Sequence, residues 1–324
     1  MDELILDILK QLRDSSQGAL DTHQLEMLIN SHNSGIDSSA HSTEREKLIP
    51  KRAILPYFLQ VKQNNEKLWR SWNVTPELEE RFIRSARMKP RRTASGVATI
   101  TVITRPHTCS SNCIYCPCDL RMPKSYLANE PACQRAELTF FDPYVQVAAR
   151  LQALHQMGHS TDKVELIVLG GTWSDYPEGY QYWFIKELFR ALNEWPNSPR
   201  YIQERLDWYT SFGLQNSEEA LSSFVAEQQA AVFDDTATYN QAFHKLYDTS
   251  QPHQSAWSQM QSTYDQLVEQ QHVNETAAAR VVGLVIETRP DTITPDNLRL
   301  FRQLGCTKIQ IGIQSTRQEI LDAN

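Results

Sequence analysis

From residue 97 onward, short apolar segments rich in β-branched residues alternate with segments whose apolar residues recur at helical intervals. Strands are predicted at 97–104, 164–171, 281–288 and 308–315, and helices at 142–158, 180–193 and 295–304. The first of these helices begins at Asp142, has Pro143 in its first turn and stops at Gly158, in agreement with helix-end preferences. Continuously hydrophobic strands that alternate with helices predict an α/β fold with a parallel sheet and right-handed crossovers.

Two parts of the chain depart from this alternation. Residues 1–92 carry apolar residues at helical spacing, for example around Leu25 and Phe82, and predict an N-terminal helical region with a linker at 31–43. Residues 199–276 predict a helical insertion between the second helix and the third strand. This insertion has 11 acidic and 3 basic residues. Because acidic side chains repel phosphates, we do not expect it to be the main RNA contact.

The composition is that of an ordinary globular protein. Of 324 residues, 40% are hydrophobic, the formal net charge is −7, and no apolar run approaches the roughly 18 residues of a membrane-spanning helix. The first residues carry no export signal, so we expect a cytoplasmic protein with no membrane partner. In that compartment the six cysteines are expected to be reduced. The net negative charge argues against a protein that coats nucleic acid by bulk electrostatics.

Positive charge is concentrated locally at 83–92. This stretch has no acidic residue and five basic ones, Arg84, Arg87, Lys89, Arg91 and Arg92. It predicts a phosphate-binding patch that contacts RNA through Lys89, Arg91 and Arg92. A solvated helix end would have the same composition and is the alternative.

Three cysteines, Cys109, Cys113 and Cys116, follow the first predicted strand with the spacing C-x3-C-x2-C. Thiolates this close in sequence can ligate three irons of a 4Fe–4S cluster and leave the fourth iron without a protein ligand. S-adenosylmethionine (SAM) can chelate that iron through its amino and carboxylate groups. Reduction then cleaves the C–S bond and leaves a 5′-deoxyadenosyl radical. The spacing therefore predicts a radical SAM cluster site.

The alternative for these cysteines is a zinc site, which usually takes its four ligands as two pairs. The sequence has no second pair. Cys118 could be a fourth ligand, but only Pro117 separates it from Cys116, which is an awkward spacing for one shared cluster. Cys133 and Cys306 are predicted to be ordinary small buried residues.

Residues near the cysteines and after the second predicted strand are candidate SAM contacts. Gly170, Gly171 and Thr172 end that strand, at the edge where parallel α/β sheets bind ligands. Glycines there let main-chain groups approach a ligand closely, and the threonine adds a hydroxyl. Tyr115 directly precedes the last cluster cysteine, and its ring could lie against adenine or pack inside the loop.

The chain resembles the catalytic subunits of Elongator, a family of radical SAM tRNA uridine acetyltransferases, from about Lys89 to Asn324. The resemblance rests on KPRRTASGVATI (89–100), CIYCP (113–117), SYLANEPACQRA (125–136), DPY (142–144), GHSTDKVELIVLGGTW (158–173), GLVIETRPD (283–291) and GCTKIQIGIQS (305–315). It implies a partial radical SAM (β/α) barrel that binds a 4Fe–4S cluster and SAM. It also implies an enzyme that forms a 5-carboxymethyl derivative of the wobble uridine of tRNA, with acetyl-CoA as carbon source.

The same resemblance implies roles for individual residues. Cys109, Cys113 and Cys116 would bind the cluster, and Gly170, Gly171, Thr172, Glu287 and Gln314 would contact SAM. Lys163 would contact acetyl-CoA, a role that suits a compact ammonium beside a phosphate. Arg289 would either neutralise a carboxylate or phosphate or form a structural ion pair.

The chain departs from the family pattern in its cysteine loop and in its length. The family usually has a longer gap between the first two cysteines, a Pro-His where this chain has Ser110 and Ser111, and a Gly-Gly where it has Cys118 and Asp119. The family also continues into the rest of the barrel and an N-acetyltransferase domain. We therefore expect 93–324 to be a radical SAM domain that is truncated C-terminally. For complete activity it would need a missing C-terminal half or a second copy.

Two other functions are weighed against this one. A radical SAM oxidase of the coproporphyrinogen dehydrogenase type shares the GGT and GxQS features, but it has no need of KPRRTASG or of the loop at Lys163. A non-catalytic tRNA-binding remnant is the second alternative. Iron content and SAM cleavage on reduction separate an enzyme from such a remnant.

Overall fold

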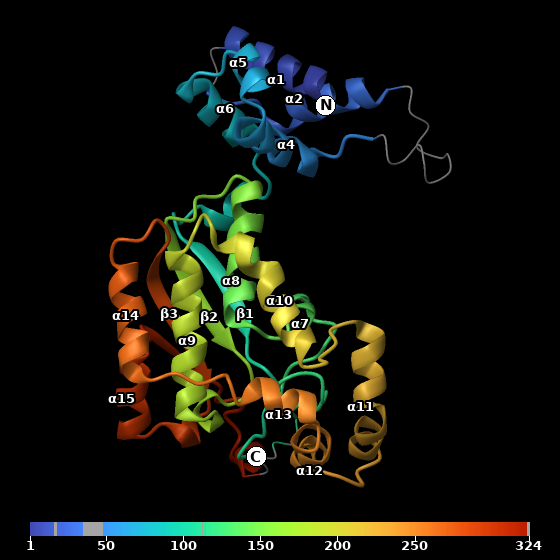
Figure 1. Ribbon diagram of the computed structural model, residues 1–324, viewed down its shortest axis with the longest axis vertical. Helices are drawn as coiled ribbons and strands as arrows, with labels where there is room; N and C mark the ends of the chain where they lie inside the picture. The colour runs from blue at the N-terminus through green and yellow to red at the C-terminus, as the bar shows by residue number, and fades with distance from the viewer. Residues whose placement is uncertain (16–17, 35–47, 112, 114, 323–324) are drawn as a thin grey trace. The chain divides into compact units, whose positions relative to one another are not determined.

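The computed structural model describes residues 1–15, 18–34, 48–111, 113 and 115–322, which form two compact units (Figure 1). The first unit comprises Met1–Gly96 together with Ala153–Ser160. The second comprises Val97–Gln152 and the chain from Thr161 onward. Among the described residues, no helix is long and apolar enough to cross a membrane.

The first unit is built from short amphipathic helices. They are α1 (Asp2–Asp14), α2 (Thr22–Asn33), α4 (Lys51–Asn64), α5 (Glu66–Ser71) and α6 (Pro76–Ala86), followed by the 3₁₀ turn η1 (Pro90–Thr93). Asp21 and Gln24 form a capping box at the start of α2, and Thr75 caps α6. The predicted linker at 31–43 begins inside α2, and its part from residue 35 lies outside the described residues.

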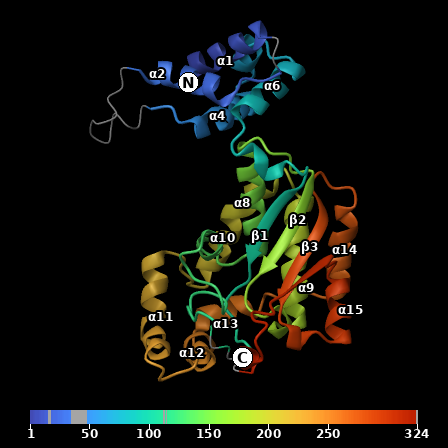
Figure 2. The same ribbon diagram turned by 180° about the vertical axis from the view of Figure 1, so that it is seen from behind.

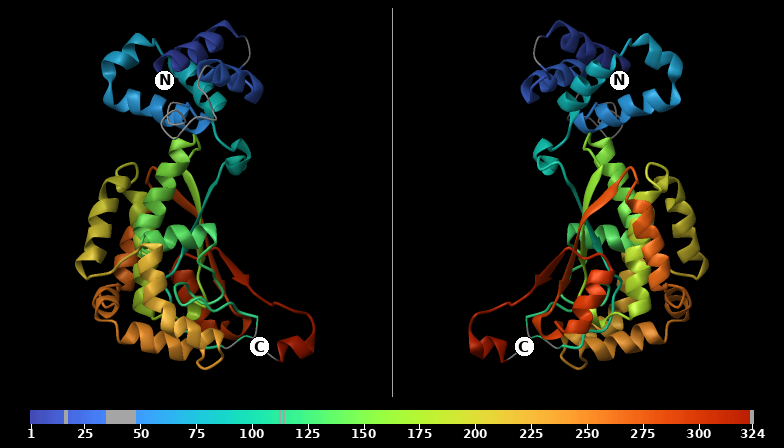
Figure 3. Two further views of the ribbon diagram at one scale, coloured as in Figure 1. Left: turned by 90° about the vertical axis from the view of Figure 1, so that its right-hand side faces the viewer. Right: turned by 90° about the vertical axis from the view of Figure 1, so that its left-hand side faces the viewer.

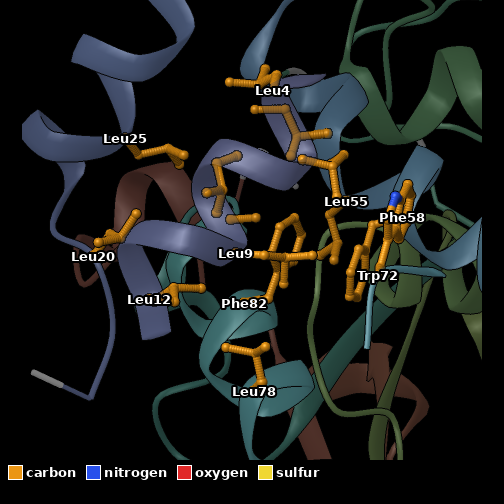
Figure 4. Close-up of a cluster of buried hydrophobic side chains, with 14 of the residues drawn as sticks. Leu4, Leu9, Leu12, Leu20, Leu25, Leu55, Phe58, Trp72, Leu78 and Phe82 are labelled. Carbon is orange, nitrogen blue, oxygen red and sulfur yellow. The ribbon is translucent and has the colours of Figure 1, made fainter. Parts of the chain in front are cut away.

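An aromatic group lies at the centre of this unit. The ring of Phe58 stacks on Phe82 with 3.9 Å between ring centroids and on Trp72 at 6.0 Å. Leu9 of α1 and Leu55 of α4 lie beside these rings, as Figure 4 shows, and further leucines of α1, α2 and α6 belong to the same buried cluster. Since each large buried side chain contributes about 1.5–3 kcal/mol, this apolar core accounts for the helical packing.

The second unit contains a four-stranded sheet in which all neighbouring strands are parallel. Its strands are β1 (Ala98–Ile103), β2 (Lys163–Leu169), β3 (Arg280–Thr288) and β4 (Lys308–Ile311), and they lie in the order β1-β2-β3-β4. The predicted parallel α/β architecture is confirmed. Since the strand order equals the chain order, every crossover along the sheet runs in the same direction.

The fourth strand is shorter than predicted, and apolar side chains at its end are exposed. It ends at Ile311, because Gln314 has a φ of 68°, a left-handed conformation that an extended strand does not contain. Ile311 and Ile313 are 45% and 62% exposed, since β4 has only β3 as a described neighbour. The predicted strand at 308–315 is therefore present, but it is shorter than predicted.

The crossover helices cover one face of the sheet. They are α8 (Pro143–Gln156), α9 (Glu178–Asn193), α14 (Tyr264–Asn274) and α15 (Pro295–Gln303). They lie behind the strands in Figure 2, and the edge-on views of Figure 3 place the helices mainly on one side. Ile100, Leu166 and Leu284 form one fully buried row across the sheet.

The adjacent row on the opposite face is less buried. It consists of Thr99, Glu165 and Gly283, which are partly or largely exposed. Further along the strands, Ile103 and Val285 lie on this same face and are buried.

Residues 199–276 form helices that pack in two different places, so they match the predicted helical insertion only in part. The turn η3 (Ser198–Tyr201), α10 (Ile202–Ser211), α11 (Glu218–Phe233), α12 (Tyr239–Phe243), the π-helical η4 (His244–Asp248) and α13 (Gln251–Trp257) precede α14. The helix α14 itself belongs to the layer on the sheet, since Asn193 of α9 donates to the Gln270 carbonyl at 2.9 Å. The helices α11 to α13 instead pack against the segment after β1. There Leu120 joins Val225, Tyr239 and Tyr247 in a buried cluster.

Candidate functional site at the carboxyl ends of the strands

One cavity is lined by the segments that follow all four strands. The segment after β1, residues 104–126, is called the cysteine loop below. The lining residues are Cys109, Cys113, Tyr115, Cys116, Lys124, Ser125, Tyr126, Gly171, Thr172, Glu287, Thr288, Arg289, Gly312 and Gln314. Apart from Gly170 and Lys163, the structure thus brings together all the residues predicted to bind the cluster, SAM or acetyl-CoA. The carboxyl edge of a parallel sheet is where such folds bind their ligands.

The three loop cysteines are free thiols with polar partners at their sulfurs. Arg289 donates from Nη1 to Sγ of Cys113. Sγ of Cys109 lies 3.4 Å from the Thr172 hydroxyl, and Sγ of Cys116 lies 2.9 Å from the Ser125 hydroxyl. Hydroxyl and guanidinium donors favour the thiolate form, which is the form that binds metals.

Burial and hydrogen bonding act in opposite directions on the pKa of the Cys113 and Cys116 thiols. At Cys113 burial raises the pKa, but the hydrogen bond from Ser111 and the positive charge of Arg289 outweigh it, so the pKa lies below its ordinary value. At Cys116 burial dominates and raises the pKa. Within the described part of the chain, no group of three or more His, Cys, Asp or Glu side chains is gathered so that it could hold a single metal ion.

The remaining cysteines lie outside this cavity. Cys118 lines a separate apolar groove with Val225 and Phe233, and its Sγ donates to the Cys116 carbonyl at 3.4 Å. Its position gives no support to the alternative in which it is a fourth ligand. Cys133 and Cys306 are buried, and burial raises the pKa of the Cys133 thiol to about 12.

Glu287, Gln314 and Arg289 come from the ends of β3 and β4. The Glu287 carboxylate accepts a hydrogen bond from the Tyr126 hydroxyl at 2.6 Å. Arg289 also pairs with Asp291, with 2.9 Å between Nε and Oδ1, and this pairing lowers the pKa of the Asp291 carboxyl. Arg289 is thus both an ion-pair partner and a donor to a cysteine sulfur.

Sequence reasoning did not assign roles to Lys124, Ser125 and Tyr126, although the structure places them in the cavity wall. Lys124 is buried and donates to the Ser111 carbonyl at 2.9 Å, which joins two parts of the cysteine loop on either side of Cys113 and Cys116. The available signal was the segment 125–136, which contributes to the family resemblance without an assigned chemical role.

Gly170 does not line the cavity, but it shapes the turn behind it. Its φ is 136°, and a Cβ added there would lie 1.9 Å from the Thr104 hydroxyl oxygen. Gly171 has a φ of 61°, and a Cβ there would meet nothing closer than 3.6 Å. The two glycines are therefore needed for different reasons, the first for space and conformation and the second for conformation alone.

Replacing Gly170 with Ala is expected to lower the free energy of unfolding by about 3 kcal/mol or more, because steric overlap adds to backbone strain. Gly171→Ala is the matched control and is expected to cost about 1–2 kcal/mol, since only the left-handed conformation opposes it. Urea denaturation of both variants measures the difference. Equal losses of stability would contradict the steric argument at Thr104.

Lys163 lies at the amino ends of the strands, opposite the end of the sheet that carries the cavity. It is the first residue of β2, is exposed, and pairs in register with Arg280 at the start of β3. At about 3.3 Å per residue, the length of β2 puts it on the order of 20 Å from the cavity. The structure therefore does not bring Lys163 to the cysteines, but it does place a second cation beside it.

The basic residues predicted to bind RNA lie in the first unit. Lys89 precedes η1 in a left-handed conformation with a φ of 50°, and Arg91 and Arg92 lie within the turn. All three are exposed, and within the described ranges none of them forms an ion pair. Arg84 differs, because it pairs with Glu80 at 2.7 Å.

The chain is similar to curated proteins over about three quarters of its length. A tRNA uridine(34) acetyltransferase of Methanocaldococcus infernus is 33% identical over 76% of this chain and 35% of its own length. The protein of that name from Dehalococcoides mccartyi is 32% identical over 72% of this chain and 36% of its own. Over its aligned part, this chain is a homologue of the tRNA uridine(34) acetyltransferase family. Elongator complex protein 3 of Schizosaccharomyces pombe is 28% identical over 75% of this chain.

The homologous region covers only part of these relatives. The chain spans about a third of the length of the curated relatives it matches. No family model matches the sequence. Among solved structures, an archaeal Methanocaldococcus infernus Elp3 with an N-terminal deletion is 27% identical, over 70% of this chain and 31% of that one, with a TM-score of 0.38.

Proposed function

We propose that this chain is the cluster- and SAM-binding part of an enzyme that modifies the wobble uridine of tRNA with acetyl-CoA as carbon source. The observation that carries the proposal is the convergence of the three loop cysteines, Thr172, Glu287 and Gln314 on one cavity. The alignment with proteins named tRNA uridine(34) acetyltransferase supports the choice of substrate.

The cysteine loop fits a 4Fe–4S cluster by the chemistry of its donors. Cys109, Cys113 and Cys116 are all free, and each would bind one iron. When bound, the cluster supplies the electron for SAM cleavage and an iron that SAM can chelate. Arg289 and the hydroxyls beside the sulfurs would balance the negative charge of the thiolates.

SAM would bind against the ends of β2, β3 and β4. The Glu287 carboxylate and the Gln314 amide oxygen are acceptors for ribose hydroxyls, and Glu287 would exchange its bond from Tyr126 for one from the ligand. Gly171 and Thr172 would line the methionine side, and Tyr115, 42% exposed, would cover adenine. The cavity volume is about 70 Å³, below the 300–1,000 Å³ typical of small-molecule sites, so binding requires the cavity to widen.

The arrangement of the sheet supports a partial (β/α) barrel. Consecutive parallel strands in chain order, with helices on one face only, are what a segment of such a barrel requires. The face that carries Thr99 and Glu165 would then line the barrel interior. Ligand-binding segments at the carboxyl ends of the strands agree with this placement.

The remaining ligands would be held by cations. Lys89, Arg91 and Arg92 are exposed, form no ion pair with any residue that the structure describes, and would contact tRNA phosphates. Lys163, with Arg280 beside it, would meet the phosphates of acetyl-CoA. Lys163 lies at the amino ends of the strands, whereas the cysteines lie at the carboxyl ends. Its contact would therefore hold the phosphates of acetyl-CoA at a distance from the cysteines.

The decisive test is SAM cleavage by the iron-loaded chain under anaerobic reduction. We expect 5′-deoxyadenosine to form, and replacement of Glu287 by Gln to weaken SAM binding roughly tenfold, because a hydrogen bond to a charged group is lost. Glu165→Gln is the matched control, since it changes a carboxylate at the amino end of the same sheet.

Substrate comparison separates the proposed function from its alternatives. Carboxymethylation by the protein should require a tRNA with uridine at the wobble position and be absent with cytidine there. Stimulation of SAM cleavage by coproporphyrinogen but not by tRNA would favour the oxidase. Tight tRNA binding without iron or SAM cleavage would favour a non-catalytic remnant.

A further inference from the structure

The cysteine loop has no regular secondary structure among its described residues, so its main-chain polar groups need partners from elsewhere. A buried N–H or C=O without a partner costs about as much as a lost hydrogen bond. Some of these groups pair within the loop, and six others, on Cys109, Cys118, Leu120 and Met122, pair with side chains of α11, α12 and η4, which lie more than 100 positions further along the chain. The shape of the loop therefore depends on these distant helices.

Asn240 of α12 makes two hydrogen bonds to a single residue of the cysteine loop, and that residue is Cys109. Its Oδ1 accepts from the Cys109 main-chain N–H at 3.1 Å, and its Nδ2 donates to the Cys109 carbonyl at 2.8 Å. A planar amide that satisfies both main-chain groups of one residue fixes the orientation of that residue. Asn240 thereby fixes the direction of the Cα–Cβ bond from which the Cys109 sulfur extends.

Three further side chains of these helices form hydrogen bonds with the main chain of the loop. Gln229 of α11 accepts from Leu120 N–H and donates to the Cys118 carbonyl, both at 2.8 Å. The hydroxyl of Tyr239 donates to the Met122 carbonyl at 2.9 Å, and that of Tyr247 donates to the Leu120 carbonyl at 2.7 Å. Tyr239 and Tyr247 are buried, so their hydroxyls have few other partners to choose from.

We propose that the α11–η4 segment (Glu218–Asp248) is a built-in scaffold that pre-organises the cysteine loop for metal binding, with Asn240 as the positioning residue for Cys109. This inference rests on the proposed cluster site. It gives the acidic insertion a role at that site that involves no contact with RNA. Pre-organised ligands lose less conformational entropy on binding, so the scaffold increases cluster retention.

The test measures loop order in the metal-free protein and iron retention in the loaded protein. Asn240→Leu keeps side-chain size but removes both hydrogen bonds to Cys109. We expect iodoacetamide to alkylate Cys109 at least about tenfold faster in this variant, and reconstituted protein to lose iron faster on dilution into chelator. Asn240→Asp keeps only the acceptor for the Cys109 N–H and should give an intermediate rate.

Alkylation of the other cysteines distinguishes positioning from general destabilisation. Cys133 lies on the helix α7 (Pro131–Leu138) and Cys306 just before β4, and both are buried. Their rates should therefore stay unchanged in Asn240→Leu, whereas partial unfolding would raise them together with Cys109. Asn216→Leu is the control, since it removes one bond from the insertion to the Leu138 carbonyl, outside the cysteine loop. If Asn240→Leu does not fold, Tyr239→Phe removes a single hydroxyl and should raise alkylation of the loop cysteines about threefold.

Two results would contradict the proposal that this segment is a scaffold. One is that Cys109 is alkylated at the wild-type rate, and iron is retained as in the wild type, in Asn240→Leu. The other is an equal rise at Cys109, Cys133 and Cys306. Failure of the proposed cluster site is distinguishable, because the wild-type chain would then bind no stable iron while the alkylation rates of the metal-free protein would still report on Asn240.

Discussion

Replacement of Cys113 with Ala is expected to abolish cluster binding. The wild-type chain should hold about four irons after anaerobic reconstitution, and the variant should hold close to none, because a cube with only two protein thiolates is released. Cys113 is the most suitable of the three for the test, since the charge of Arg289 and the Ser111 hydroxyl already favour its thiolate. Iron and sulfide analysis together with the visible spectrum measures the loss.

Cys118→Ala is the matched control for this experiment. It changes a cysteine of the same loop whose sulfur faces the apolar groove at Val225 and Phe233 and does not line the cavity. We expect this variant to keep its iron. A full, stable cluster in Cys113→Ala would refute the ligand assignment, and loss of iron in both variants would show that Cys118 takes part in binding.

Neutralisation of Lys89, Arg91 and Arg92 by Gln is expected to weaken tRNA binding on the order of a hundredfold at 0.1 M salt. Each phosphate contact releases condensed counterions, so the slope of log affinity against log salt should fall by roughly 2–3 when three contacts are removed. The loss should be similar for all tRNAs, because phosphate contacts carry no sequence information. Filter binding over a range of salt concentrations provides both quantities.

The control for this triple variant is a second set of exposed cations of the first unit. Lys10, Arg52 and Lys67 lie on different helices, α1, α4 and α5, and form no ion pair within the described ranges. Their replacement by Gln changes net charge by the same amount. If both triple variants lose affinity equally, only overall charge matters, and the three residues at η1 are an ordinary solvated surface.

The strands were predictable because their signal is local. Apolar, β-branched runs between helices located β1, β2 and β3 within one or two residues. The same reasoning overextended β4, because the left-handed conformation of Gln314 depends on its surroundings and leaves no mark in the hydrophobic pattern.

The candidate site was predictable where chain order and sheet geometry coincide. Residues that directly follow parallel strands meet at one edge, so Cys109, Thr172 and Glu287 could be grouped before the structure was known. Lys163 is the first residue of β2, so the same rule places it at the amino ends of the strands, away from the cavity. Asn240 could not be found this way, because an amide in a polar helical insertion has no local feature that points to a partner 131 positions away.

The distance between the cysteine loop and its partners also sets an order of events during synthesis. The hydrogen bonds from Asn240 and Tyr247 join residues separated by 131 and 127 positions, so they form only after most of the chain has left the ribosome. At about 5–20 residues per second, the thiols emerge many seconds before the side chains that orient them. Such non-local contacts form late in folding. Throughout that interval the three cysteines are exposed to oxidants and stray metals, so correct loading with iron must follow translation of the insertion.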